Sequence, residues 1–142
     1  MKIIEAKYDE ISGYSQVVIE YKGKLYVGSA TCHPEEEFRS KFAGCRYAEL
    51  RAKIKALKAE RRKMKQECEL LRKFVTACGL CKNFDKDTKT AKVVYRQLNT
   101  KIREVNKLTD KINNLLEDLE IGIKQRDIVN KALQNKRSKK DN

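Results

Sequence analysis

The sequence is poor in the residues that build compact, irregular folds. It contains no tryptophan and a single proline, and aromatic residues make up only 7% of the chain. Charged residues, in contrast, make up 37%. This composition suits long solvated helices better than a compact sandwich or an α/β enzyme. At 142 residues, the chain has room for one domain, or for a small domain with a helical extension.

Long apolar runs and a secretory signal are also missing. No window approaches the 18 uninterrupted apolar residues of a membrane-spanning helix, which excludes a membrane span. The chain has five cysteines, an odd number, and no leader precedes them. Such a set favours reduced thiols in the cytosol over a disulfide framework. We therefore expect a cytoplasmic protein that does not enter a membrane.

The motifs of catalysis and metal binding are absent. There is no Gly-rich phosphate loop, no Gly-x-Ser-x-Gly and no His-Glu-x-x-His. Cys78 and Cys81 have a zinc or redox spacing, but no second pair completes a tetrahedral site, and helix-end packing is the preferred interpretation. The only histidine, His33, precedes Pro34 and is interpreted as a helix-entry residue rather than a general base. We expect no catalytic residue, metal or cofactor, and hence no enzyme.

Three segments rich in strand-forming residues open the chain, at 2–8, 14–21 and 25–31. The segments between them, 9–13 and 22–24, carry the Gly and Asp that tight turns require. This pattern predicts an antiparallel three-stranded β-meander. Three short strands cannot close a core alone, so one face must pack on a helix or on another subunit.

Pro34 and the three acidic residues after it mark the start of a short helix that Gly44 ends. Beyond Gly44, apolar residues recur at alternating spacings of three and four, which is a heptad seam, interrupted only where Arg61 occupies the expected position between Leu57 and Met64. The seam positions are Tyr47, Leu50, Ile54, Leu57, Met64, Cys68, Leu71, Val75 and Cys78. A second seam comprises Val94, Leu98, Lys101, Val105, Leu108, Ile112, Leu115, Leu119, Gly122, Arg126, Val129 and Leu133. A loop of about seven residues between them predicts an antiparallel helical hairpin.

The sequence thus predicts an α+β protein in three parts. These are a β-meander with a short helix at 1–43, a long two-helix hairpin at 44–136, and a disordered basic tail at 137–142. Gly122 is expected to mark a bend or break, since glycine costs roughly 1 kcal/mol against alanine inside a helix.

The net charge of +13 favours an anionic partner. Residues 44–82 hold 12 basic and 4 acidic groups, whereas residues 1–43 hold 6 and 7, so the first long helix is the basic element. It is either a solvated helix face or an anion-binding surface. Charges at seam positions Arg61, Lys101 and Arg126 serve either register and ion pairing or ligand contact.

One constellation has the chemistry of a nucleotide site. Phe84 and Tyr95 could stack a base, while Arg96, Asn99 and Arg103 share a helix face and could meet phosphates or ribose. The alternative is that Phe84 caps the open end of the hairpin.

The first third of the chain resembles the phage Thoeris anti-defence proteins of the first type, which sequester nucleotide signals. The resemblance rests on the following residues: Tyr8-Asp9, Gly13-Tyr14-Ser15, His33-Pro34-Glu35 and Phe42-Ala43-Gly44-Cys45-Arg46-Tyr47-Ala48-Glu49-Leu50-Arg51-Ala52. It implies a homo-oligomer, a hexamer, in the bacterial host cytoplasm. It also implies binding of cyclic ADP-ribose isomers without degradation, and cyclic oligonucleotides in separate pockets.

Ligand contacts are predicted on chemistry and listed here: Arg46, Arg51, Phe84, Arg96, Asn99 and Arg103. Two alternatives stay open beside the sponge. One is a basic helical nucleic-acid-binding protein, although no aromatic RNA motif or helix-turn-helix is present. The other is a coiled-coil inhibitor of a protein partner.

Overall fold

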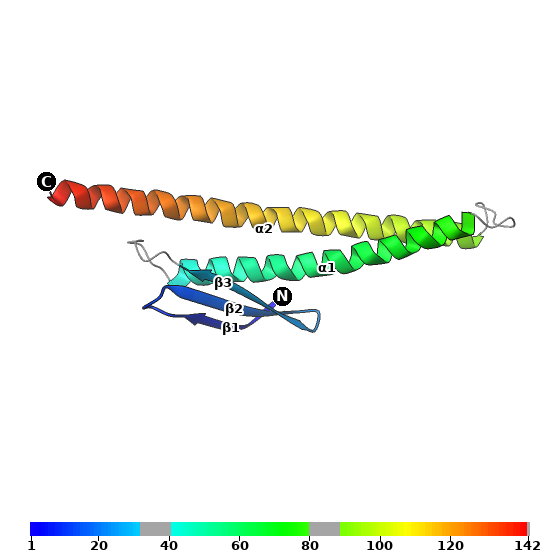
Figure 1. The fold of residues 1–142 in the computed structure, drawn as a ribbon, viewed down its shortest axis with the longest axis horizontal. Coiled ribbons are helices and arrows are strands. Elements are labelled where there is room, and N and C mark those ends of the chain that lie inside the picture. Colours follow the sequence, from blue (N-terminus) through cyan, green and yellow to red (C-terminus); the bar gives the residue numbers. More distant parts are fainter. Residues whose placement is uncertain (32–40, 80–88, 142) are drawn as a thin grey trace. The chain divides into compact units, whose positions relative to one another are not determined.

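The computed structural model describes residues 1–31, 41–79 and 89–141 (Figure 1). The strands are β1 (Lys2–Tyr8), β2 (Tyr14–Tyr21) and β3 (Lys24–Thr31), and the helices are α1 (Lys41–Gly79) and α2 (Lys89–Asp141). The predicted fold class is confirmed: an antiparallel three-stranded sheet is followed by two long helices. Most of the short helix expected after Pro34 lies outside the described residues. The expectation that Gly44 ends it is wrong, because α1 begins at Lys41 and continues through Gly44.

The chain folds as two compact units. The first, here the sheet unit, comprises Met1–Ala56 and Asn113–Asn142, and the second, here the hairpin unit, comprises Leu57–Ile112. Each unit therefore contains a stretch of α1 and a stretch of α2. The predicted boundary after residue 43 lies inside α1, whereas the units meet between residues 56 and 57.

The sheet has the order β1-β2-β3, and both pairs are antiparallel. A left-handed backbone at Lys22 (φ 50°) and Gly23 (φ 77°) turns β2 into β3, which is the conformation of a tight two-residue hairpin loop. In the β1–β2 pair, Ile3 faces Ile19 and Glu5 faces Val18. Residue 4 is therefore an extra residue, a β-bulge in β1.

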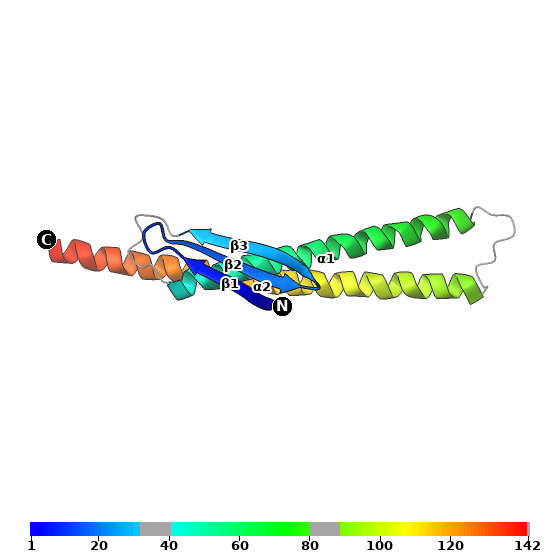
Figure 2. The ribbon, with the colours of Figure 1, turned by 90° about the horizontal axis from the view of Figure 1, so that it is seen from below.

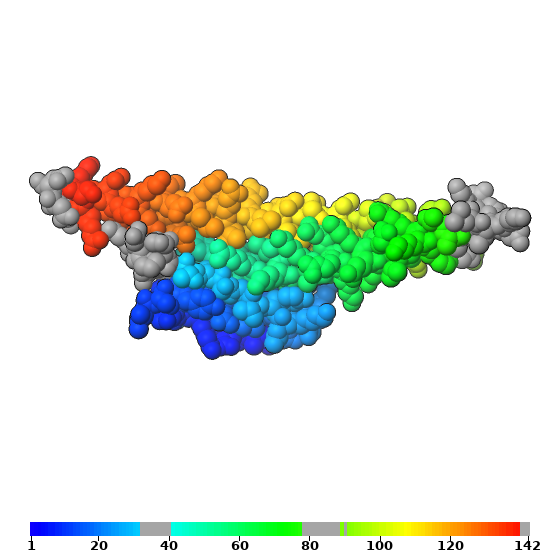
Figure 3. All heavy atoms as spheres, in the orientation of Figure 1, coloured from blue at the N-terminus to red at the C-terminus, as the bar shows by residue number. Residues whose placement is uncertain are grey.

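One face of the sheet packs on the start of α1. The buried sheet side chains are Val17, Ile19 and Ala30, and the helix meets them with Ala48, Ala52 and Ala56. Figure 3 shows the strand atoms lying directly against the first turns of α1. The sequence left open whether the sheet packs on a helix or on another subunit, and the structure shows a helix.

Gly28 brings β3 onto the helix backbone itself. A Cβ atom added there would lie 2.5 Å from the Ala52 amide nitrogen and closer still to the Ala48 carbonyl oxygen. Contacts this short do not occur, so only glycine permits the approach.

The heptad seams are buried as the periodicity predicts. Leu50 and Ile54 in the sheet unit, and Leu57, Cys68 and Leu108 in the hairpin unit, are all less than 9% exposed. Other seam positions, including Met64, Leu71 and Leu98, are half-buried, and Val129 is 41% exposed.

Two expectations for α2 are wrong. The helix is continuous through Gly122, so this glycine marks no break, and α2 reaches Asp141, so residues 137–141 are helical rather than disordered. Among the described residues, neither helix has a stretch long and apolar enough to cross a membrane.

Candidate functional site

The first turns of α1 and the C-terminal half of α2 form an open groove within the sheet unit. Phe42, Arg46 and Leu50 follow one another at intervals of four, so they share one face of α1. The groove has a volume of about 270 Å³. The lining residues are Phe42, Ala43, Arg46, Tyr47 and Leu50 from α1, and Asp118, Ile121, Gly122 and Gln125 from α2. We call this the Arg46 groove.

Tyr47 fixes the two helices at the floor of this groove. Its hydroxyl donates a hydrogen bond to the Gly122 carbonyl oxygen at 2.7 Å, and the Arg126 guanidinium lies 5.5 Å from the centre of its ring. A Cβ atom on residue 122 would stand 2.7 Å from Tyr47 Cε1. Gly122 is therefore needed for close approach of the tyrosine ring, which is the physical reason for a glycine inside a continuous helix.

The groove combines apolar lining residues with one weakly paired cation, the Arg46 guanidinium. Phe42 is 82% exposed and presents its ring to solvent at the rim. The Arg46 guanidinium lies 3.6 Å from the Glu49 carboxylate, which Lys53 approaches more closely, at 2.8 Å. Because the Arg46 side chain is exposed and its pair is long, the interaction is weak. An anion could therefore recruit Arg46 at small cost. Asp118 and Gln125 add groups that bind hydroxyls and amide edges, so the groove has the chemistry to hold a base, a ribose or a phosphate.

A second, more basic groove lies on α1 in the hairpin unit. It has a volume of about 430 Å³. Its lining residues are Lys58, Arg61, Arg62, Lys65, Gln66 and Glu69. They follow one another at spacings of three, one, three, one and three, which keeps them on one flank of the helix. We call this the basic groove, and its charge suits phosphate groups.

Arg51, one of the predicted ligand contacts, has a structural partner. Its Nη1 donates a hydrogen bond to the Ser29 carbonyl oxygen at 2.7 Å, and Lys55 Nζ donates to the Val27 carbonyl oxygen at 2.8 Å. These two side chains cover the outer edge of β3. Arg51 does not line the Arg46 groove.

The remaining predicted contacts lie in the hairpin unit or outside the described residues. Arg96, Asn99 and Arg103 are exposed and share one face of α2, as predicted. That face is opposite the buried seam position Leu108. None of the three residues lines the Arg46 groove or the basic groove. Phe84 lies outside the described residues.

The charges at seam positions all have partners, which favours the register interpretation over ligand contact. Lys101 Nζ donates a 2.6 Å hydrogen bond to Glu67 Oε2, and this bond raises the pKa of Lys101 and lowers the pKa of Glu67. Arg61 Nη1 donates to Thr109 Oγ1 at 3.3 Å. Both bonds join α1 to α2 inside the hairpin unit.

Of the nine lining residues of the Arg46 groove, the sequence prediction of ligand contacts included only Arg46. Phe42, Asp118 and Gln125 are among those it missed. The four-residue spacing of Phe42, Arg46 and Leu50 is a signal for a shared face, but nothing in the sequence places Asp118 beside them. Across residues 1–31, 41–79 and 89–141, no group of three or more His, Cys, Asp or Glu side chains could hold a metal ion.

Comparisons of the chain with protein-family models, with curated protein sequences and with solved structures gave no match.

Proposed function

We propose that the protein binds and sequesters a phosphate-bearing cyclic nucleotide of the cyclic ADP-ribose class, without degrading it, in the cytoplasm of a bacterial host. The observation that carries the proposal is the lining of the Arg46 groove. Five of its nine lining residues come from the Phe42 to Ala52 stretch on which the resemblance to the Thoeris anti-defence proteins mainly rests. An exposed ring and a weakly paired guanidinium stand together there.

Each group in the groove has a role in this proposal. A purine stacks on the Phe42 ring, and Arg46 exchanges Glu49 for a phosphate oxygen, which gives a stronger, charge-assisted bond. Asp118 and Gln125 accept hydrogen bonds from ribose hydroxyls or from the base. Sequestration requires tight binding and no chemistry, so a fixed groove floor, here the Tyr47 to Gly122 bond, is the property that matters.

The size of the groove bears on assembly. Pockets for whole small molecules usually measure about 300–1,000 Å³, and the Arg46 groove, at about 270 Å³, fits a nucleoside better than a complete cyclic dinucleotide. The remaining contacts would come from other copies in a homo-oligomer, a hexamer by the resemblance. The exposed face with Arg96, Asn99 and Arg103, together with Arg51 and Phe84, stays a predicted source of such contacts.

The test is retention of intact ligand. Purified protein is incubated with cyclic ADP-ribose isomers, freed of unbound nucleotide and heated, and the released molecules are identified by mass spectrometry. We expect unchanged ligand. Arg46→Ala should weaken binding roughly 10- to 100-fold, because hydrogen bonds to a charged group contribute about 1.5–3 kcal/mol. Arg62→Ala, which removes the same charge from the basic groove, is the matched control. Recovery of altered nucleotide, or equal loss in both variants, contradicts the proposal.

A second candidate function is binding of duplex nucleic acid through the basic groove. The observation that favours it is the exposure of Lys58, Arg62 and Lys65 on one flank of α1. Such binding depends on phosphate contacts and weakens steeply with salt. Tight duplex binding that Arg62→Ala reduces and Arg46→Ala does not, together with no nucleotide retention, would favour this function.

A further inference from the structure

The two edges of the sheet are unlike. On β3, the carbonyl oxygens of Val27 and Ser29 accept hydrogen bonds from Lys55 and Arg51. On β1, residues 2–7 are all exposed, and no described residue is seen to pair with the outer edge (Figure 2). An uncovered edge presents unpaired N–H and C=O groups, which are a template for another strand.

The hydrogen bonds to β2 show which groups of β1 point outward. The Asp9 amide donates to the Tyr14 carbonyl oxygen at 2.9 Å, so Asp9 points toward β2. The backbone N–H and C=O groups of successive residues alternate in direction along an antiparallel ladder. Those of Lys7 and Glu5 therefore point toward β2 as well. The backbone groups of Ala6 and Tyr8 therefore point to the open edge, and any new strand must pair with these alternate residues.

We propose that β1 pairs antiparallel with β1 of a second copy of this chain, about a twofold axis at Ala6. In this register Ala6 faces Ala6, so the outward-pointing backbone groups of Ala6 form a hydrogen-bonded pair at the axis, and Tyr8 lies opposite Ile4, the bulge residue. Glu5 of each copy then faces Lys7 of the other. The inference does not rest on the proposed ligand, because it uses only the sheet.

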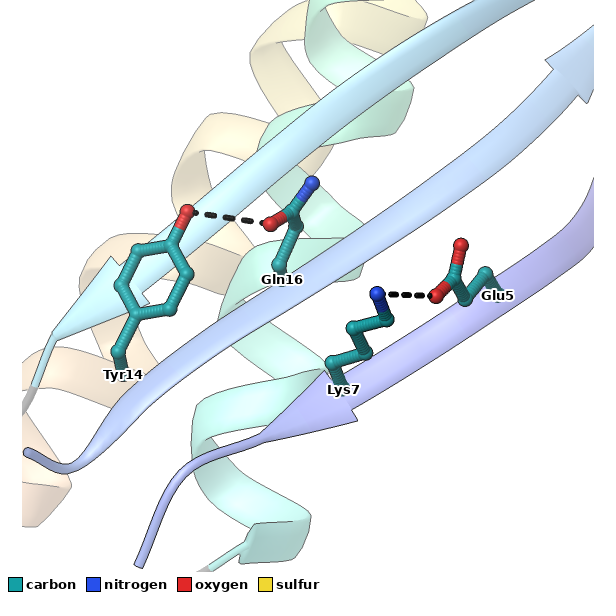
Figure 4. A network of polar contacts seen from close by, with 4 residues as sticks. All are labelled: Glu5, Lys7, Tyr14 and Gln16. Atoms are coloured by element: carbon teal, nitrogen blue, oxygen red, sulfur yellow. Dashed lines mark hydrogen bonds and ion pairs between the residues drawn. The ribbon is translucent and has the colours of Figure 1, made fainter. Parts of the chain in front are cut away.

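Charge favours this register over the two neighbouring ones. Glu5 and Lys7 lie on the same face of the sheet, 2.9 Å apart, and their side chains are 48% and 71% exposed (Figure 4). Shifting the axis by one residue in either direction places Glu5 opposite Glu5 or Lys7 opposite Lys7, and like charges directly opposite are unfavourable. Edge charges often protect a strand from pairing, but here the two signs are arranged to complement a second copy.

Apolar surface and edge closure favour the same arrangement. Ile3 and Ile4 are each 48% exposed, and the register brings Ile4 against Tyr8 of the other copy. The paired sheet has six strands, with a β3 strand at each end. At each of those ends Lys55 and Arg51 occupy the carbonyl oxygens of Val27 and Ser29, so the dimer leaves no edge as open as that of β1.

The experiment is a charge exchange in the full-length protein. Glu5→Lys and Lys7→Glu each turn two opposite-charge pairs into like-charge pairs, so each variant alone should dissociate at about tenfold higher concentration than the wild type. An equimolar mixture restores both pairs between unlike chains. With one variant carrying a mass tag, native mass spectrometry should show mainly mixed dimers. The intrachain pair cannot be restored by mixing, so recovery reports on the contact between chains.

Three outcomes would overturn the proposal. The first is a wild-type chain that stays monomeric at high concentration in sedimentation. The second is self-association that neither single variant weakens. The third is a mixture that recovers no more association than its components. Circular dichroism of both variants serves as the control for folding, and both exposed sites should leave the spectrum unchanged. Nucleotide retention by the Arg46 groove is measured separately, so loss of one property does not decide the other.

Discussion

Replacing Gly28 by alanine tests whether β3 lies directly on the backbone of α1. The new methyl carbon would stand 2.5 Å from the Ala52 amide nitrogen, where an ordinary contact begins at 3.4 Å. The strand must therefore retreat by at least 0.9 Å, the difference between these two distances. Neither neighbouring atom can rotate away, because both belong to the helix backbone.

The loss in the free energy of unfolding depends on the packing contacts that this retreat of β3 would separate. Val17, Ile19 and Ala30 pack against the alanines of the same helix face, and a gap of 0.5–1 Å forfeits about a quarter to a half of each dispersion contact. Overpacking usually costs about 1–3 kcal/mol, and we expect the upper end, about 3 kcal/mol. For a chain of this size that corresponds to a melting temperature lower by roughly 10 °C.

Urea denaturation followed by circular dichroism at 222 nm measures this free energy, with all proteins at one concentration because association shifts apparent stability. Ser29→Ala, the exposed neighbour, is the matched control and should fall within about 0.5 kcal/mol of the wild type. Ala48→Gly should not rescue Gly28→Ala, since the obstructing oxygen is a backbone atom. A Gly28→Ala protein as stable as the control would refute the close approach.

Three further perturbations test individual contacts. Tyr47→Phe removes the hydrogen bond to the Gly122 carbonyl and should lower the free energy of unfolding by about 1 kcal/mol in the same urea assay. The pKa of Glu67 is lowered by the bond from Lys101, so its contribution is present above the unfolded value near 4.5 and is lost as the pH falls through the folded value. Melting temperatures of Glu67→Gln should accordingly show less acid dependence than those of the wild type. Lys55→Ala uncovers a carbonyl on the β3 edge and should raise aggregation, measured by light scattering.

Local patterns account for most of what the sequence predicted about the fold. The strand positions follow from β-forming residues bounded by turns, and the first two strands have the bounds that were expected. The seam positions Leu108 and Ile112 are buried because a heptad repeat keeps one side of each helix facing its partner. Gly122 was misjudged because its requirement comes from Tyr47, 75 residues away, and no local rule contains that contact.

The candidate site was predicted less well for a related reason. Helical periodicity correctly placed Arg96, Asn99 and Arg103 on one exposed face, but it carries no information about what covers a face. Arg46 was predicted on its chemistry, and it lines a groove. The residues opposite it come from a distant part of α2, so their arrangement depends on which turns of the two helices meet.

The small residues of α1 explain how this helix packs on the sheet with one face and on α2 with another. Gly44, Ala48, Ala52 and Ala56 recur at intervals of four, and the three alanines pack under the sheet, while the larger seam residues beside them face α2. At about 1.5 Å per residue this stripe spans about 18 Å, enough to carry most of a strand of eight residues at about 3.3 Å each. The next position in the series is Glu60, which cannot admit a sheet so closely. The stripe therefore ends at Ala56, the residue at which the sheet unit also ends along α1.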